Sequence, residues 1–493
     1  MKHLPIVPLL TVMLLTVPAA AHRSVPVYDH VVERCLDALM AHGLDTYGPE
    51  TTPVLVSIID LETLTCPQEP PPLDEPWRVI RRHRRNPAGA DLATDMPTLT
   101  VMHARGGAYA DFALRYARYY LNHMKSERGL VCWGWHDYYD VYTDRCHVHQ
   151  HELHAGVDPM DWKLLFEADR EATLGVVENI WRWHVIDKKT GEINRHGDGK
   201  RGCDFSMSAG AYIEAFAHAY AETSDKKWVD RARLLANYYW ERRNPETNLF
   251  PERPNAGMDR FDGSHFVTAI TGPYCGALLR AYELTQDALF LDHALTYLRA
   301  YGQYGYDQEA NAYWGSLCLD GMPNDEPTEP DGYGKYEPRG YLDLWKPYCL
   351  GYQHPLLTGL SYLEAYRLTR APDMLSHAKR FGYWVVKARP GEDGIRTDTW
   401  YGEYAKSRAE AGAYAGMYGR AIALLTGLYH ATDEHCTWLR TAKKYGDLVI
   451  EKLQHESGLL RGHPEKDYYE AVDGVGELLR ALSQLEDAKP IVL

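Results

Sequence analysis

The sequence predicts an all-α protein in which paired helices close into an (α/α) toroid, or barrel, of seven helical hairpins. Two observations lead to this fold class. A helix–turn–helix pattern recurs with a period of roughly 60 residues, longer than the repeat of a typical open helical solenoid. Each second helix is followed by a Gly or Asn and an aromatic loop, so we expect these loops to gather at one end of the ring.

The N-terminus has the composition of a secretory signal. It begins with basic residues, residues 4–17 form an apolar run too short to span a bilayer comfortably, and three alanines at 19–21 supply the small residues that signal peptidase requires. We expect residues 1–21 to be cleaved and the protein to be secreted or periplasmic; a retained N-terminal anchor is the alternative. Residues 22–493 then form a single (α/α)-barrel catalytic domain.

Four segments show the repeat most clearly. They span residues 219–240, 281–301, 365–385 and 428–449, and each has a Tyr near the end of its first helix and a Thr three residues later. A short polar turn follows, and the second helix has apolar residues at spacings of three and four. We expect Thr, Ser or Asp in the turn to cap the second helix, since their side-chain oxygens accept the amides of its first turn.

Glycine or asparagine follows the second helices, and both residues tolerate the left-handed conformation that ends a helix. We expect such helix ends at Gly43, Gly129, Gly191, Asn248, Asn311, Gly394 and Gly458. The last helix, 473–485, has no partner after it in the sequence. We expect it to pack on the first helix of the mature chain, 27–41, because a closed ring leaves no apolar end exposed.

The composition excludes some classes of function. Asp and Glu number 68 against 53 Lys and Arg, and the resulting net charge of −15 argues against nucleic-acid binding. The chain has 36 Tyr but only 9 Phe, which favours surfaces that are both apolar and hydrogen-bonding, as sugar-binding clefts are. None of the nine cysteines forms a CxxC pair. Cys132 and Cys146 flank one loop and either form a disulfide or remain thiols.

The densest group of candidate catalytic residues lies in the loop 193–202. It contains Asn194, Arg195 and His196, followed by Lys200 and Arg201. A carboxamide and guanidinium groups suit a sugar carboxylate, and an imidazole can move a proton. The alternative is a solvated basic turn.

Other loops offer candidate substrate-binding side chains, because Trp and Tyr rings stack on pyranose rings and polar groups bind hydroxyls and carboxylates. These candidates are Trp135, His136, Glu152, Arg260, Tyr348, Tyr352, Tyr414, Arg420, His463, Tyr468 and Tyr469. The alternative is that the aromatic rings cap the core of each hairpin.

No metal and no cofactor is expected. His147, His149 and His151 precede Glu152, but the segment does not have the HExxH spacing of a helical zinc site. The sequence also has no GxSxG elbow, no phosphate-binding loop and no dinucleotide fingerprint.

These features together resemble the secreted helical-toroid polysaccharide lyases, such as alginate and glucuronan lyases with (α/α)6 or (α/α)7 barrels. The resemblance implies β-elimination on an acidic polysaccharide or oligosaccharide. From the charge we expect no nucleic-acid partner, and from the lack of a later long apolar run no membrane partner after signal cleavage. It implies that Asn194 and Arg195 neutralise the uronate carboxylate and that His196 assists removal of the C5 proton. His265, Tyr274 or a tyrosine from another loop then replaces the tyrosine that such lyases use to protonate the leaving oxygen.

Two other functions remain open from the sequence. A glycoside hydrolase on the same scaffold needs two cleft carboxylates, for which Asp204, Asp262, Glu152, Glu470 and Asp473 are available. A non-catalytic glycan-binding protein is the third possibility. A lyase differs from both because its product gains ultraviolet absorbance from a conjugated double bond.

Overall fold

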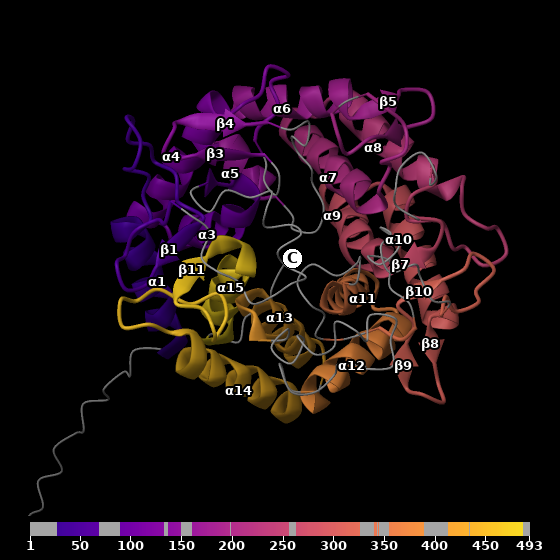
Figure 1. Ribbon diagram of the computed structural model, residues 1–493. Coiled ribbons are helices and arrows are strands. Elements are labelled where there is room, and N and C mark those ends of the chain that lie inside the picture. Colours follow the sequence, from indigo (N-terminus) through magenta and orange to yellow (C-terminus); the bar gives the residue numbers. More distant parts are fainter. Residues whose placement is uncertain are drawn as a thin grey trace, which may run out of the picture.

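The computed structural model describes residues 27–68, 89–132, 137–148, 160–197, 199–255, 263–325, 340–342, 344, 354–388, 413–432 and 434–486. Its helices form a ring of two layers around a central axis (Figure 1). The mostly helical toroid expected from the sequence is confirmed. Among the described residues, no helix combines the length and the apolar character needed to cross a bilayer.

The inner layer consists of the helices whose side chains line the centre of the ring. These are α3 (Leu92–Arg105), α5 (Trp162–Ala168), α7 (Ser206–Thr223), α9 (Cys275–Thr285), α11 (Pro355–Thr369), α13 (Ala415–Ala431) and α15 (Val475–Glu486). The outer layer consists of α1 (Val27–His42), α4 (Gly107–His123), α6 (Arg170–Trp183), α8 (Lys226–Trp240), α10 (Ala288–Tyr304), α12 (Pro372–Lys387) and α14 (His435–Leu453).

Burial differs between the layers in the way the sequence pattern requires. On the outer helix α14, the buried residues Trp438, Ala442, Tyr445 and Val449 recur every three or four positions and form one apolar face. The inner helix α13 is buried almost all round, because it packs against α14, α11 and α15 at once. Amphipathic helices therefore enclose more uniformly apolar ones.

Short strands lie in the long connections between the layers. They are β1 (Ile58–Asp60), β2 (Gly89–Ala90), β3 (Tyr138–Asp140), β4 (Arg145–His147), β5 (Val185–Asp187), β6 (Glu192–Ile193), β7 (Phe266–Val267), β8 (Tyr306–Asp307), β9 (Ala312–Tyr313), β10 (Ser316–Leu317) and β11 (Tyr468–Glu470). The π-helical turn η1 (Ile270–Tyr274) leads into α9, and the 3-10 turn η5 (Ala471–Asp473) leads into α15. Each long connection runs from an outer helix to an inner one, so these connections share one end of the ring.

The two ends of the helical chain close the ring, as the sequence predicts. Helix α1 packs on α15. The Tyr28 hydroxyl at the start of α1 donates to Asp447 Oδ1 on α14 at 2.7 Å. Strand β1 pairs antiparallel with β11, with Ile58 opposite Glu470. The first and last segments therefore hold each other through both side chains and backbone.

The short turns between inner and outer helices have a common cap that corrects one expectation. The Thr223 hydroxyl donates to the Ala219 carbonyl at 2.6 Å and accepts the Asp225 amide at 3.2 Å, so it closes the inner helix instead of starting the outer one. Ser224 between them is left-handed, with φ of 57°. Asp225 is the N-cap of α8 and accepts the Lys227 amide at 3.0 Å. The same threonine contacts recur at Thr285, Thr369 and Thr432.

The expected glycine and asparagine helix ends are only partly correct. Gly191 has a φ of 84°, but α6 already ends at Trp183, and Gly191 closes the turn between β5 and β6. Gly129, Asn248, Asn311 and Gly458 also have positive φ and also lie beyond their helices. Gly43 directly follows α1 without a positive φ, and Gly394 lies outside the described residues. These glycines and asparagines are therefore needed for the tight turns that follow the outer helices, and less for the helix ends themselves.

The abundance of tyrosine has a structural origin in the described part of the chain. The hydroxyl of Tyr239 on α8 donates to the Asp204 carbonyl, and that of Tyr301 on α10 donates to the Trp314 carbonyl, each at 2.7 Å. Tyr445 on α14 likewise donates to the Val385 carbonyl at 2.7 Å. A buried tyrosine ring thus packs in the core while its hydroxyl satisfies backbone that would otherwise lack a partner.

The ring closure predicts an asymmetry between two positions on α1. Leu36 is fully buried on this helix, whereas Val27 at its start is 60% exposed. We expect Leu36→Ala to lower the free energy of unfolding by about 2–5 kcal/mol, because it leaves a cavity in the closing contact. Val27→Ala should change it by less than about 0.5 kcal/mol. Urea unfolding measures both; equal stability of the two variants would mean that α1 contributes little to the ring.

The thiols of Cys132 and Cys146 lie in hydrogen-bonding contact, and this contact lowers the pKa of Cys146. In an oxidising compartment we expect them to form a disulfide. Of the nine cysteines, seven (9 − 2) should then react with a thiol reagent after denaturation without reductant. Cys146→Ser should raise the count to eight (9 − 1), because it releases Cys132. Nine reactive thiols in the exported wild-type protein would contradict the pairing.

Candidate active site

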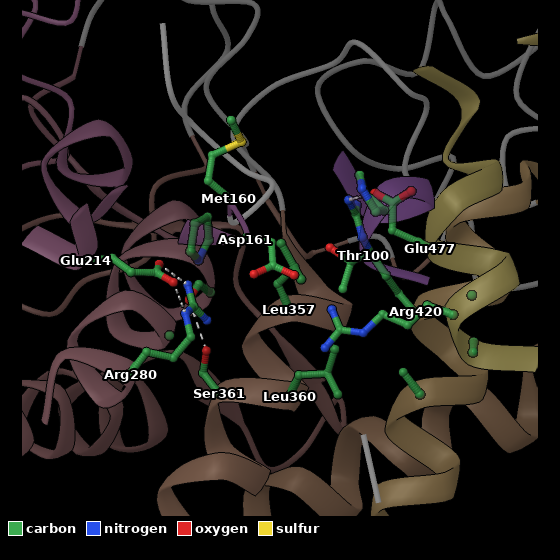
Figure 2. A pocket seen from close by; sticks show the side chains of 18 of the residues that line it. Thr100, Met160, Asp161, Glu214, Arg280, Leu357, Leu360, Ser361, Arg420 and Glu477 are labelled. Carbon is green, nitrogen blue, oxygen red and sulfur yellow. Dashed lines mark hydrogen bonds and ion pairs between the residues drawn. The ribbon is translucent and has the colours of Figure 1, made fainter. Parts of the chain in front are cut away.

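A cavity of about 430 Å³ lies at the centre of the toroid (Figure 2). Side chains from every inner helix line it, and its walls combine apolar groups with charged ones. Met160, Leu357 and Leu360 form part of the apolar surface. Cavities of this size with a few converging polar groups are typical of small-molecule or sugar-binding sites.

Two arginines in the cavity are held by glutamates. Arg280 on α9 forms a bidentate pair with Glu214 on α7, with both N–O distances at 2.8 Å. Arg420 on α13 lies 3.3 Å from Glu477 on α15. A Cβ on Gly419 would lie 2.8 Å from the backbone of Glu477, so this glycine allows α13 and α15 to approach closely enough for the pair. Figure 2 shows both pairs directed into the cavity.

Further ionisable groups complete the cavity lining. Arg480 lies one turn beyond Glu477 on α15, and His218 lies one turn beyond Glu214 on α7. Burial lowers the pKa of His218, which favours its neutral form. Asp161, which caps α5, and Lys163 also line the cavity. The cavity therefore collects four basic and three acidic side chains besides this histidine.

The loop 193–202 joins β6 to the start of α7, at the long-loop end of the ring. The carboxamide of Asn194 is engaged within the loop: Nδ2 donates to the Lys200 carbonyl at 2.6 Å, and Oδ1 accepts the His196 amide at 2.8 Å. Asn194 is buried. It therefore shapes the loop and positions its neighbours, a different role from the direct carboxylate contact expected of it.

Arg195 lies against Phe205, with its guanidinium carbon 3.7 Å from the ring centre. Arg253 lies over the same ring at 5.1 Å. Glu252 is close by: it accepts the Ser206 hydroxyl at 2.5 Å, and burial raises its pKa to about 8 while Arg195 opposes that rise. Arg195 and Arg253 thus lie next to the Glu252 carboxyl group, whose pKa burial raises.

His265 joins this neighbourhood through the backbone. The Glu252 amide donates to the His265 carbonyl at 2.9 Å, and the Arg253 amide donates to the Gly263 carbonyl at 3.0 Å. The side chains of His196 and His265 are both half-buried. Two of the loops expected to carry catalytic residues therefore meet at residues 252–253, a segment that the sequence did not mark as functional.

Tyr274 does not fit the role of a proton donor. It is fully buried, and its ring lies 5.3 Å from Tyr239, 5.8 Å from Phe250 and 6.2 Å from Tyr297. Burial raises its pKa well above the ordinary value. A phenol enclosed by aromatic rings is poorly placed to protonate a sugar, so the mechanism proposed below uses His265 in place of Tyr274.

The loop before α15 is more buried than a stacking surface requires. The rings of Tyr414 and His463 lie 4.6 Å apart, and both side chains are buried. Tyr468 and Tyr469 on β11 are also buried, so in this structure these four side chains expose little ring surface for stacking, and their role in substrate binding stays a prediction. Lys466 pairs with Glu470 at 2.9 Å and with Asp473. These residues build the wall of the ring.

Several expected residues cannot be placed. Trp135, His136, Glu152, Arg260, Tyr348 and Tyr352 lie outside the described residues, as do His149 and His151. His147 is described; it stacks on Tyr138 and lies 3.5 Å from Asp140. Within the described ranges, no three His, Cys, Asp or Glu side chains gather as metal ligands.

Of the charged residues in the cavity, only Arg420 is among the candidates expected from the sequence. The other charged residues lie within helices or at a helix start, whereas the expected chemistry lay in loops. The available signal was a charged residue on a helix that is otherwise almost wholly apolar, as Glu214 is on α7 and Arg280 is on α9. Such residues are costly to bury unless they are paired or functional.

Comparison with known proteins gives the class of activity. Residues 98–209 match the periplasmic pectate lyase family. The matched segment runs from α3 to the start of α7 and includes the loop 193–202. The expected polysaccharide lyase acting on a uronic-acid polymer is confirmed by this match, and the family is described as periplasmic.

Solved structures resemble the whole ring. A D-mannose isomerase superposes with a TM-score of 0.51 at 11% identity, covering 94% of this chain and 99% of that one. A cellobiose 2-epimerase from Bacillus thermoamylovorans B4167 gives 0.49 at 11% identity, covering 94% and 97%. An inactive α-1,6-mannanase variant from Salegentibacter sp. HEL1_6 gives 0.48 at 11% identity, covering 93% and 99%. At such identities the isomerase likeness concerns the fold alone.

The raised pKa of Glu252 predicts a pH-dependent stability. Between its ordinary pKa and about 8, the folded state holds a proton that the unfolded state has lost, so stability should fall as pH rises through this window. We expect Glu252→Gln to remove that part of the slope. Urea unfolding at about pH 5 and about pH 9 measures it. The exposed Glu246→Gln is the matched control, and equal slopes for both variants would contradict a buried, protonated Glu252.

Proposed function

We propose that the chain is a periplasmic lyase that cleaves pectate, with the chemistry carried by the loop 193–202. The observation that supports this most strongly is the pectate lyase match, which includes that loop. We also propose that residues 1–21 direct export, that residues 22–493 form one domain and that seven helical hairpins make the ring. The pairing of α1 with α15 and of each inner helix with the next outer helix supports the hairpin count.

In the proposed reaction, a uronate residue binds with its carboxylate near Arg195. Neutralising the carboxylate acidifies the C5 proton, because the negative charge that develops on the carboxyl group is stabilised. His196 takes the proton from C5, and the electron pair of the broken C5–H bond forms the C4–C5 double bond. The C4–O bond breaks, and His265 gives a proton to the leaving oxygen. Asn194 holds the loop and orients His196 through the 2.8 Å contact with its amide.

The described carboxylates favour this reaction over glycoside hydrolysis. A hydrolase needs two cleft carboxyl groups that can act on the sugar. Asp204 is fully buried and accepts the Tyr238 hydroxyl at 2.6 Å, and Glu470 and Asp473 are both paired with Lys466. In the cavity, Glu214 and Glu477 are paired with arginines.

Substitutions in the loop test the proposal directly. With polygalacturonate as substrate, the wild type should form a product that absorbs in the ultraviolet. We expect His196→Ala to lower kcat by about 10²–10⁴ through loss of proton transfer. Arg195→Lys keeps the charge but loses the planar fork, and we expect a fall of about 10²–10³.

Lys189→Ala is the control, since Lys189 is exposed on the turn between β5 and β6 and leaves the loop intact. Circular dichroism checks that each variant is folded. Polygalacturonate cleavage without an absorbing product, or full activity in His196→Ala, would overturn the proposed mechanism.

A further inference from the structure

Glu252 joins three segments of the proposed site. The amide of Ser206, the first residue of α7, donates to the Glu252 carbonyl at 3.1 Å, and the Ser206 hydroxyl donates to the Glu252 carboxyl group at 2.5 Å. On its other side, the Glu252 amide donates to the His265 carbonyl at 2.9 Å. Glu252 therefore ties the start of α7, which follows the loop 193–202, to the segment that carries His265.

Two guanidinium groups lie beside this junction. Arg195 and Arg253 both lie over the ring of Phe205, at 3.7 and 5.1 Å from its centre, and both arginines are buried. A Cβ on Gly263 would lie 2.5 Å from Cβ of Arg253, so this glycine lets the segment before His265 approach closely. The charge of Glu252 therefore acts on the same small volume as the charges of both arginines.

The carboxyl group of Glu252 is enclosed and only half satisfied. The residue is 2% exposed, and within the described ranges its Oε1 has no hydrogen-bond partner. Burial raises its pKa to about 8, while the Ser206 hydroxyl and the charges of Arg195 and Arg253 oppose the rise. Tyr239 and Tyr274 also face Glu252, but burial raises the pKa of both phenols well above the ordinary value, so they stay neutral here.

We propose that Glu252 is a positioning residue that regulates uronate binding through its own protonation. The neutral carboxyl group leaves the charge of Arg195 to the uronate carboxylate, whereas the ionised group competes with the uronate for that charge. The inference rests on the proposed function and adds the control of the same site by pH. Its geometric basis is the junction itself, where one buried carboxyl group lies between the loop 193–202, Arg253 and the segment of His265.

The competition must act in both directions, because linkage between two binding events is reciprocal. If ionised Glu252 weakens uronate binding, bound uronate must in turn favour the protonated form of Glu252. Binding near pH 8 should therefore take up protons from solution. A residue that only held the fold together would produce neither this uptake nor a pH-dependent affinity.

Calorimetric titration with trigalacturonate tests the inference. The titrations use full-length protein carrying His196→Ala, so that no turnover interferes. Between about pH 6.5 and about pH 9.5, we expect the Kd to rise about 10-fold when Glu252 is present, the lower end of the effect of a hydrogen bond to a charged group. In Glu252→Gln, which cannot ionise, the same change of pH should raise the Kd less than about 3-fold.

Proton uptake is read in the same experiment. At about pH 8, the binding heat should depend on the ionisation enthalpy of the buffer when Glu252 is present, and this dependence should disappear in Glu252→Gln. Glu252→Ala also removes the acceptor of the Ser206 hydroxyl, so it should weaken binding at both pH values. Circular dichroism at each pH checks that the variants are folded.

Glu246→Gln is the matched control, because it makes the same change in residue and net charge at an exposed position. An equal pH dependence of Kd in Glu252→Gln and Glu246→Gln, or no trigalacturonate binding at either pH, would overturn the inference. The lyase assay with otherwise wild-type protein is read separately. If no absorbing product forms while binding still responds to pH through Glu252, the proposed function fails and the role of Glu252 in binding stands.

Discussion

The packing of the last helix on the first is the constraint on which the rest of the structure depends. A single helical hairpin cannot bury its apolar face alone, and each pair in the ring covers the next. Where α15 meets α1, and β1 pairs with β11, the first and last segments cover one another and no pair is left open. The ring in turn fixes the inner helices as the walls of one enclosed space, which is why a cavity exists at the centre.

Closure also determines where chemistry can lie. Long connections all run from outer to inner helices, so they meet at one end of the ring, and the loop around Arg195 lies there with residues 252–253. The inner helices carry charged residues toward the axis, where Glu214 and Glu477 balance two of the arginines. In the proposed mechanism the polar rim supplies proton transfer, while the interior holds paired charged side chains.

Repeated residues that suggested function proved to hold the scaffold together. The tyrosines fill the core between helices, and hydroxyls such as that of Tyr239 reach the carbonyls of the long loops. The threonines at the ends of inner helices bond back to the preceding turn and receive the amide that follows, as Thr223 does. Both features recur around the ring because every hairpin has helix ends whose backbone groups need hydrogen-bond partners.

The sequence by itself determined the helical period, the hairpin repeat and the pairing of the terminal helices, because apolar spacing and turn residues are local properties that each segment carries alone. The class of reaction came from the resemblance to polysaccharide lyases. The sequence also singled out Arg195, His196 and His265 as candidate catalytic residues. Only the tertiary structure decided that Tyr274 lies in the core, that Asn194 serves its own loop and that Arg280, Arg420 and Arg480 share one cavity. Burial and convergence depend on which faces of distant helices meet, and no single segment encodes that.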